Sequence, residues 1–370
     1  MIDGEFFRKK LHSIAELSGN ERLTSEYISK DLISLNTLKV SKIGGFGVLA
    51  SSATSGGYLL RADIDALPIG EEHLQINHAS QHNGVAHKCG HDGHSTILRE
   101  VAHEFQSNPS ERPFHLLFQP SEENGKGAPA VIKDAQFETI SPDFAFGMHN
   151  IPGYPLSDVL VKKGIITAAV VTLIIKFKGV SAHASSPEKG QSPIPAITEL
   201  LAKIDRIQNQ KNIDKYLLIT TTFIQVGTPS NGTSPGDAQI NLTVRCFDNE
   251  FLEQICNKIT LTVEEIASEN KLQFNIDEED RFDACDNNSE AVDLIIEAAN
   301  YAGLKVTLLK EPFPFGEDFG AYSRILPSCF FGLGAGIDQA PLHHPDYDFP
   351  DELIHPAKQL WNFLINKPLS

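Results

Sequence analysis

The sequence lacks a long apolar run, a secretory leader pattern and a cysteine framework. No window approaches the ~18 consecutive apolar residues of a membrane-spanning helix. The N-terminus has no apolar core followed by a small-residue cleavage site, so we expect no secretory signal. The 5 cysteines are odd in number and lack disulfide-framework spacing, which fits a reducing compartment. We therefore expect a soluble cytoplasmic protein.

Positive charge is also scarce. The 31 lysines and arginines face 48 aspartates and glutamates, which gives a net charge of −17. This balance argues against nucleic-acid partners, which require basic stripes, and against anionic membrane surfaces. Apolar residues make up 41% of the 370 residues, so the chain can bury a core and is not disordered. Its length exceeds the ~100–200 residues of one domain and predicts two.

Strands and helices are expected to alternate in the first and last parts of the chain. This pattern predicts an α/β domain with a mostly parallel sheet over residues 1–168 and 281–370. Between them, residues 169–280 follow the order β-α-β-β-α-β, which is typical of an inserted ferredoxin-like α+β domain. The predicted helices are 6–16, 21–35, 95–105, 193–208, 249–269, 289–302 and 351–366, and the predicted strands are 58–61, 114–118, 143–146, 170–178, 217–226, 239–247, 272–276 and 328–333.

The segment HKCGHDGHS, residues 87–95, is the first candidate for chemistry. It combines a thiol, imidazoles and a carboxylate, which are groups that bind first-row divalent metals. Its glycines and the predicted helix after it would allow several side chains to point at one place. No second Cys or His pair follows at zinc-finger spacing. Taken alone, the segment is equally compatible with a loop that only caps a helix.

Polar side chains also follow several predicted strands. Glu122 and Glu123 come after FHLLF, His149 comes after DFAFG, and His343 comes soon after CFFGL. Asp65 lies at the end of the first predicted strand. In open α/β sheets, ligands bind beyond the carboxyl ends of the strands. These residues therefore predict one site that gathers acids, imidazoles and the thiol.

The ordered set of motifs resembles the two-metal amidohydrolases, a family that includes aminoacylases, hippurate hydrolases, auxin-conjugate hydrolases and N-acetyldiaminopimelate deacetylases. The resemblance runs from residue 11 to residue 352, nearly the whole chain. Each segment alone is weak evidence, whereas the ordered set is specific. The matching segments are LHSIAELSGNE, RADIDALPI, HKCGHDGHS, QPSEENGKGA, GMHN, KGVSAHASSP, GEDFGAY and PLHHPDYDFPDE.

The resemblance implies a dimetal-hydrolase domain that binds two divalent ions, with Mn, Zn, Ni and Co all compatible with mixed S, N and O ligands. His344 stands where the family often has Asn, so we expect it to be a neighbour of the metals and not a ligand. Asp65 matches an acid that orients the site. The implied metal ligands are Cys89, His91, Glu123, His149 and His343.

The resemblance also implies catalytic and substrate-binding roles. Glu122 would be the general base, because its neighbour Glu123 is committed to metal. His183 lies in the inserted domain, which the family uses as a dimerisation or lid domain, and would reach the active site of the partner subunit. Asn231 and Arg245 match positions that contact the polar end of the substrate, and Arg245 would pair with a carboxylate.

Four positions depart from the family pattern, and one of them is Ala15, which replaces the common Pro of the N-terminal segment. Lys88 stands where a small residue is usual before the cysteine, and Ser121 replaces Ala before the acid pair. Asn231 is followed by Gly-Thr-Ser-Pro instead of Val-Ile-Pro. None of these changes removes an implied metal ligand, but the last one alters a substrate-contacting loop.

The sequence thus predicts hydrolysis of the amide bond in an N-acyl amino acid or a small related conjugate, by a homodimer built through the inserted domain. Three alternatives stay open at this point. The protein could be a di- or tripeptidase, a dedicated N-acetyldiaminopimelate deacetylase, or a metal-binding protein without turnover. An uncommitted acid at Glu122 argues against the last alternative, because a pure binding protein needs no base.

Overall fold

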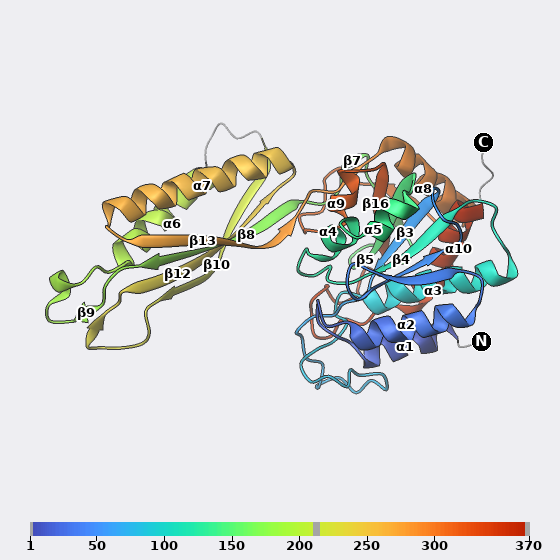
Figure 1. Ribbon diagram of the computed structural model, residues 1–370, viewed down its shortest axis with the longest axis horizontal. Helices are drawn as coiled ribbons and strands as arrows, with labels where there is room; N and C mark the ends of the chain where they lie inside the picture. The colour runs from blue at the N-terminus through green and yellow to red at the C-terminus, as the bar shows by residue number, and fades with distance from the viewer. Residues whose placement is uncertain (1–2, 210–214, 367–370) are drawn as a thin grey trace. The chain divides into compact units, whose positions relative to one another are not determined.

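The computed structural model describes residues 3–209 and 215–366 and divides into two compact units (Figure 1). The first unit contains Met1–Ile166, Cys285–Phe313 and Glu317–Ser370. The second unit contains Thr167–Ala284 and Pro314–Gly316. The chain of the first unit is therefore interrupted by the second.

An eight-stranded sheet forms the centre of the first unit, in the order β1-β2-β4-β3-β5-β16-β6-β15. Strands β4, β3, β5 and β16 are parallel to one another. The predicted mostly parallel α/β sheet is thus confirmed at its centre, while β1 and β2 add an antiparallel edge that was not predicted. The bounds are β1 Lys39–Ile43, β2 Gly47–Ser51, β3 Tyr58–Asp63, β4 Phe114–Gln119, β5 Phe144–Ile151, β6 Val159–Val161, β15 Val306–Leu308 and β16 Ser328–Gly334.

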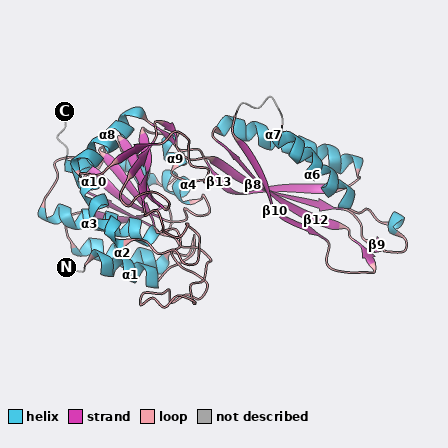
Figure 2. Ribbon diagram, turned by 180° about the vertical axis from the view of Figure 1, so that it is seen from behind, coloured by secondary structure: helices cyan, strands magenta, loops and turns pink. Residues whose placement is uncertain are grey.

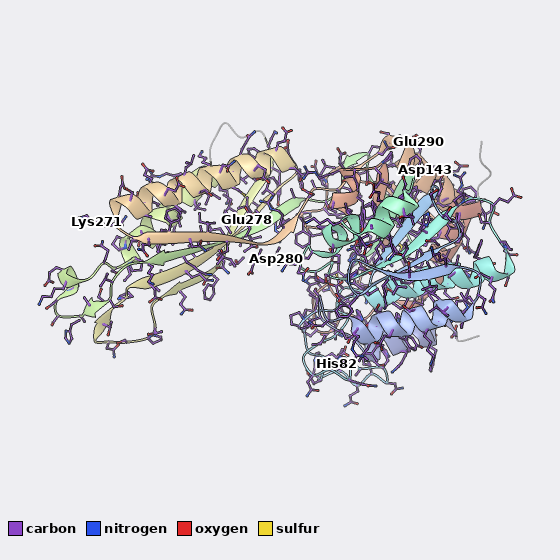
Figure 3. All side chains as sticks on the ribbon, in the orientation of Figure 1. His82, Asp143, Lys271, Glu278, Asp280 and Glu290 are labelled. Carbon is purple, nitrogen blue, oxygen red and sulfur yellow. The ribbon has the colours of Figure 1, made fainter. Side chains whose placement is uncertain are left out.

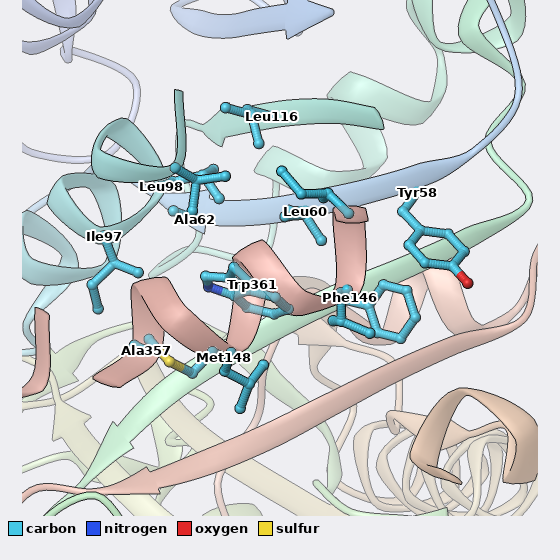
Figure 4. Close-up of a cluster of buried hydrophobic side chains, with 14 of the residues drawn as sticks. Tyr58, Leu60, Ala62, Ile97, Leu98, Leu116, Phe146, Met148, Ala357 and Trp361 are labelled. Carbon is cyan, nitrogen blue, oxygen red and sulfur yellow. The ribbon is translucent and has the colours of Figure 1, made fainter. Parts of the chain in front are cut away.

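Amphipathic helices bury their apolar faces against this sheet. In Figure 4, Trp361 and Ala357 of α10 lie beside Phe146 and Met148 of β5, within one continuous buried cluster. Burial of each large apolar side chain stabilises the fold by about 1.5–3 kcal/mol before entropy is counted. The helices of this unit are α1 Gly4–Ser13, α2 Arg22–Ser34, α3 His91–Ser107, α4 Gly127–Ile132, α5 Ala135–Ile140, α8 Ser289–Tyr301, α9 Gly320–Ser323 and α10 Ile354–Asn366.

The second unit is an antiparallel sheet in the order β10-β12-β8-β13, with α6 and α7 on one face (Figure 2). Its chain order β8-α6-β10-β12-α7-β13 confirms the predicted ferredoxin-like arrangement. The bounds are β8 Ala169–Lys178, α6 Ile194–Gln208, β10 Leu217–Val226, β12 Asp237–Cys246, α7 Asn249–Glu269 and β13 Gln273–Phe282. Across the described residues of both units, no helix combines the length and apolar character needed to cross a membrane.

Among the predicted element ends that were wrong, two lie at the candidate site. The helix predicted from residue 95 begins at His91, because Gly90 adopts a left-handed conformation directly before it. The strand predicted to end at residue 146 continues to Ile151, so His149 lies within β5 and not after it. Its last residues pair with Gly332–Gly334 of β16, a partner strand that local sequence cannot reveal.

Candidate metal centre

All five implied metal ligands lie in the first unit, on segments that meet at one edge of the sheet. The carboxyl ends of parallel strands meet there, so residues distant in sequence come together. The ligands come from four separate segments of the chain. Cys89 precedes α3, His91 is the first residue of α3, Glu123 follows β4, His149 lies in β5 and His343 follows β16.

The turns that present these ligands have unusual backbone conformations. Gly90 has a φ of 93°, and a Cβ atom there would lie 2.3 Å from Asn150 Oδ1. Only glycine fits this position. Ser121 and His343 have φ values of 56° and 62°, in the left-handed region that L-residues rarely adopt. Such strained residues are often found at functional sites, where the surroundings hold them in place.

The ligand atoms lie close enough to bind a pair of ions. Cys89, His91 and His149 form one group and Cys89, Glu123 and His343 another, with the ligand atoms of each group within 4.8 Å of one another. Cys89 belongs to both groups, so its thiolate would be shared. Among the described residues, His91 Nε2 and Glu123 Oε1 are buried without a hydrogen-bond partner. Buried polar atoms are nearly always satisfied, so these two atoms without a partner fit the role of metal ligands.

Second partners fix the orientation of the imidazoles. His91 Nδ1 donates to the carbonyl oxygen of Asp65 at 2.9 Å, and His149 Nδ1 donates to the carbonyl oxygen of Asn150 at 2.8 Å. In both rings Nε2 is then the nitrogen that would bind metal. The Asp65 carboxylate also accepts from the backbone N–H of Glu123 at 3.0 Å. Asp65 therefore connects two of the implied ligands.

The electrostatics of the site favour a bound cation. Burial raises the pKa of the Cys89 thiol well above its usual value, and the charges of Glu123, Glu122 and Asp63 raise it further. Burial likewise raises the pKa of Glu123 to about 7, although His91 opposes the shift. The thiolate and carboxylate forms thus require compensation by positive charge, which a metal ion supplies.

Glu122 lies beside this cluster with its side chain buried, and its Oε2 is 4.0 Å from His91 Nε2. Burial raises the pKa of Glu122 well above its usual value, and the charges of Glu317, Glu123 and Asp318 add to the effect. Only Arg61 opposes them among the main causes. Burial and the neighbouring acids thus favour the protonated form of the Glu122 carboxyl group.

Arg61 and the buried acids Glu317 and Asp318 were not predicted to belong to the site. Arg61 forms ion pairs with Asp63 at 2.8 Å, Glu317 at 2.9 Å and Asp318 at 2.7 Å. These four side chains are all nearly inaccessible to solvent. An arginine inside the apolar run YLLRAD was a signal for such a network, because charged residues are almost never fully buried unpaired.

A second cluster with metal-like spacing contains His12, His78 and Asp348. Arg8 Nη1 lies 2.9 Å from carboxylate oxygens of both Asp348 and Asp92. Burial alone would lower the pKa of His12, but its hydrogen bonds to Asp92 and Glu71 raise that pKa to about 9. Protonated His12 and Arg8 therefore already neutralise these acids. The cluster joins α1 to the ligand-bearing start of α3 through ion pairs.

The other three implied site residues lie in the second unit. His183 is exposed in the short strand β9 (Ala182–His183), and its Nδ1 lies 2.8 Å from the Ser185 hydroxyl. Asn231 is exposed in the turn before β11 (Thr233–Ser234). Arg245 of β12 donates to the carbonyl oxygen of Pro314 at 3.2 Å. Their roles toward a site in the first unit stay predictions.

Known proteins match the chain over nearly its full length. The model of peptidase family M20/M25/M40 matches residues 59–367. N-acetyl-L-cysteine deacetylase of Bacillus subtilis is 32% identical over 94% of this chain and 83% of its own length. Hippurate hydrolase of Campylobacter jejuni is 30% identical over 100% of this chain and 97% of its own.

Two solved structures extend the comparison. A dinuclear metal-binding peptidase of the M20 family from Bacillus subtilis has a TM-score of 0.80 at 26% identity, covering 98% of this chain and 96% of its own. A putative aminohydrolase from methicillin-resistant Staphylococcus aureus has a TM-score of 0.84 at 23% identity, covering 98% and 95%, and so shows a shared fold. The protein therefore belongs to peptidase family M20/M25/M40 and is a metal-dependent hydrolase of amide bonds.

Proposed function

We propose that the protein hydrolyses the amide bond of an N-acyl amino acid or a small related conjugate, releasing an acid and a free amino acid. One observation carries the proposal: two groups of ligand atoms share Cys89, and Glu122, which belongs to neither of these two groups, lies with its Oε2 4.0 Å from His91 Nε2. The relatives named as hippurate hydrolase and N-acetyl-L-cysteine deacetylase support an acylated amino acid over a peptide.

The five ligands would hold two divalent ions in this site. Two such ions, when bound, lower the pKa of a water molecule and polarise a carbonyl group. Glu122 would accept the proton of the attacking water and deliver it to the nitrogen of the leaving amine. Arg61 would keep the charges of Glu317 and Asp318 balanced, so that Glu122 can take up and release this proton.

Residues of the second unit would complete the substrate site. We assign His183 to the developing oxyanion, as a donor contributed by the partner subunit. The Ser185 hydroxyl engages Nδ1 of His183, so Nε2 is the atom that would donate. Arg245 would pair with the carboxylate of the amino-acid moiety, and Asn231 would bind the same polar end.

The two edges of the second unit's sheet support a homodimer through β10. The β13 edge carries charged residues, among them Glu278 and Asp280 (Figure 3), which protect an edge strand from pairing. Residues 217–226 of β10 include no charged side chain, and Phe223 and Ile224 are 41% and 45% exposed. A second copy pairing along β10 would cover these side chains and present His183 to its partner.

Cys89 can serve as a ligand only while its thiol is reduced. All five cysteines are free and buried. This state supports a reducing, cytoplasmic location. Its sulfur, the imidazoles and the carboxylate together suit Mn, Zn, Ni or Co, and occupancy would follow availability.

A substrate panel tests the proposal. The protein is reconstituted with Mn²⁺ or Zn²⁺, and release of free amine is followed from N-acetyl and N-benzoyl amino acids, N-acetyldiaminopimelate, and di- and tripeptides. We expect turnover of the acylated amino acids, and a fall in kcat of about 10²–10⁴-fold in Glu122→Gln. Preference for peptides, or for N-acetyldiaminopimelate alone, would favour the corresponding alternative. Metal binding without any turnover would reject the proposal.

A further inference from the structure

We infer that Lys88 is a positioning residue for His343, and this inference rests on the proposed ligand set. Lys88 precedes Cys89 and is completely buried, at a position where the resembling family usually has a small residue. A buried lysine is rare unless it is paired. Its side chain therefore has a task in this chain that a small residue does not perform.

The backbone carbonyl group and the side-chain ammonium group of Lys88 both bind the turn that carries His343. The carbonyl oxygen of Lys88 accepts from the backbone N–H of His343 at 2.8 Å. The Nζ of Lys88 donates to the carbonyl oxygen of Tyr347 at 2.9 Å. The same ammonium group lies 2.5 Å from Glu71 Oε2. Residues 343–347 are thereby tied at their beginning and at their end to the segment that contains Cys89.

Glu71 is itself a fixed anchor for Lys88. Its Oε1 accepts from the backbone N–H of Ser80 at 2.7 Å, and its carboxylate also pairs with His12 at 3.1 Å. Burial would raise the pKa of Glu71, but His12 and Lys88 outweigh it and lower that pKa to about 2. The carboxylate stays charged under ordinary conditions, so the ion pair to Lys88 persists.

His343 is the implied ligand that most needs such support. Its side chain is 52% exposed, whereas Cys89, His91 and His149 are buried. It lies in a turn with a left-handed φ of 62°, and not on a helix or a strand. A strained residue keeps its conformation only where the surrounding contacts determine it. Lys88 supplies such contacts to both ends of this turn.

Replacement of Lys88 should weaken the binding of one ion more than that of the other, because the two ligand groups have only Cys89 in common. His343 belongs to the group with Cys89 and Glu123, whereas His91 and His149 belong to the other group. Loss of the Lys88 ammonium group should weaken binding of the ion that uses His343. By analogy with other residues that orient metal ligands, the affinity for that ion should fall about 10- to 100-fold. General damage to the fold would weaken both ions.

Two variants separate positioning from folding. Lys88→Met keeps most of the apolar stem but leaves the buried carboxylate of Glu71 without one of its two cationic partners, which destabilises the protein. Lys88→Met/Glu71→Gln also removes that carboxylate charge, so part of the lost stability should recover while the bond to Tyr347 stays lost and His12 keeps its pair with Asp92. Arg99→Met is the matched control, because it removes another buried cation of the first unit, which pairs with Asp31 of α2.

The test is calorimetric titration of the metal-free proteins with Zn²⁺, with thermal melting of the same samples. We expect two equivalents in the wild type, an unchanged first equivalent and a weakened second in both Lys88 variants, and wild-type binding in Arg99→Met. An unchanged second equivalent in Lys88→Met, or recovery of the second equivalent together with the melting temperature in the double variant, would overturn the inference. Fewer than two equivalents in the wild type would instead overturn the proposed metal site and the inference with it.

Discussion

Cys89 Sγ lies 3.3 Å from His149 Nε2, although Cys89 precedes α3 and His149 lies inside β5. Both side chains are buried, and burial lowers the pKa of His149 well below its usual value, with the charge of His94 adding to this effect. A neutral imidazole has a lone pair to donate to a metal. The contact therefore marks the point at which two distant parts of the chain would meet one cation.

Replacement of Cys89 by Ala should remove a ligand from both ions at once, because both ligand groups contain it. We expect fewer than two bound ions per chain and loss of amide hydrolysis. Metal content after dialysis, measured by mass spectrometry, checks this outcome. Cys256→Ala is the control, since Cys256 is also buried but lies in α7 of the second unit. Two retained ions in Cys89→Ala would contradict the shared-ligand arrangement.

Adjacent glutamates should respond differently to the same substitution. Glu123→Gln removes a charged ligand, so metal content should fall together with activity. Glu122→Gln should keep both ions and lose activity, because only the group that transfers the proton is removed. Parallel measurement of bound metal and kcat in the two variants distinguishes the roles. Equal metal loss in both would show that Glu122 is also a ligand.

Gly90→Ala should disturb the metal centre because the new Cβ atom would lie 2.3 Å from Asn150 Oδ1. Gly84 is a matched control, since its φ of 71° is also left-handed but a Cβ atom there would contact nothing within 4 Å. Gly84→Ala should cost only the backbone strain, about 1–2 kcal/mol. We expect Gly90→Ala to lose more stability than this and to bind metal weakly. Equal effects in denaturation and metal titration would refute the steric argument.

His12 should give the protein a pH-dependent stability. Its pKa is raised from 6.5 to about 9 in the folded state, so its contribution is fully present below pH 6.5 and is lost as the pH rises through 9. The difference in unfolding free energy between wild type and His12→Gln should be largest near pH 6 and shrink toward about pH 9.5. Urea unfolding across this range measures it. A difference that grows with pH would reverse the assigned sign.

The arrangement of the site was largely predictable because it follows from chain direction. Glu123 and His343 follow parallel strands, and the carboxyl ends of such strands meet at one edge whatever the rest of the sequence does. The end of β5 was not predictable in this way. His149 belongs to the strand because Gly332 of β16 pairs with it. This partner strand follows the inserted unit in the sequence, far from β5 along the chain.

Contacts among side chains were harder to foresee than strand ends. Arg61 was visible as a charge in an apolar strand. Its pairing with Glu317 and Asp318 depends on a tertiary contact between segments more than 250 residues apart, which no local sequence pattern encodes. The buried ion pair of Lys88 with Glu71 joins two loops, and loop paths follow from tertiary packing. The roles of His183 and Arg245 depend on a further surface, that of a partner subunit, and therefore stay proposals.

The interrupted chain of the first unit imposes an order on biosynthesis. Cys89, His91 and His149 leave the ribosome before the second unit, whereas His343 leaves after it. During translation of the inserted segment, the nascent polypeptide therefore carries three ligands of one ion but lacks a ligand of the other. The ligand set of one ion is therefore complete in the chain before the inserted unit is translated, whereas the set of the other ion is completed only when His343 has emerged.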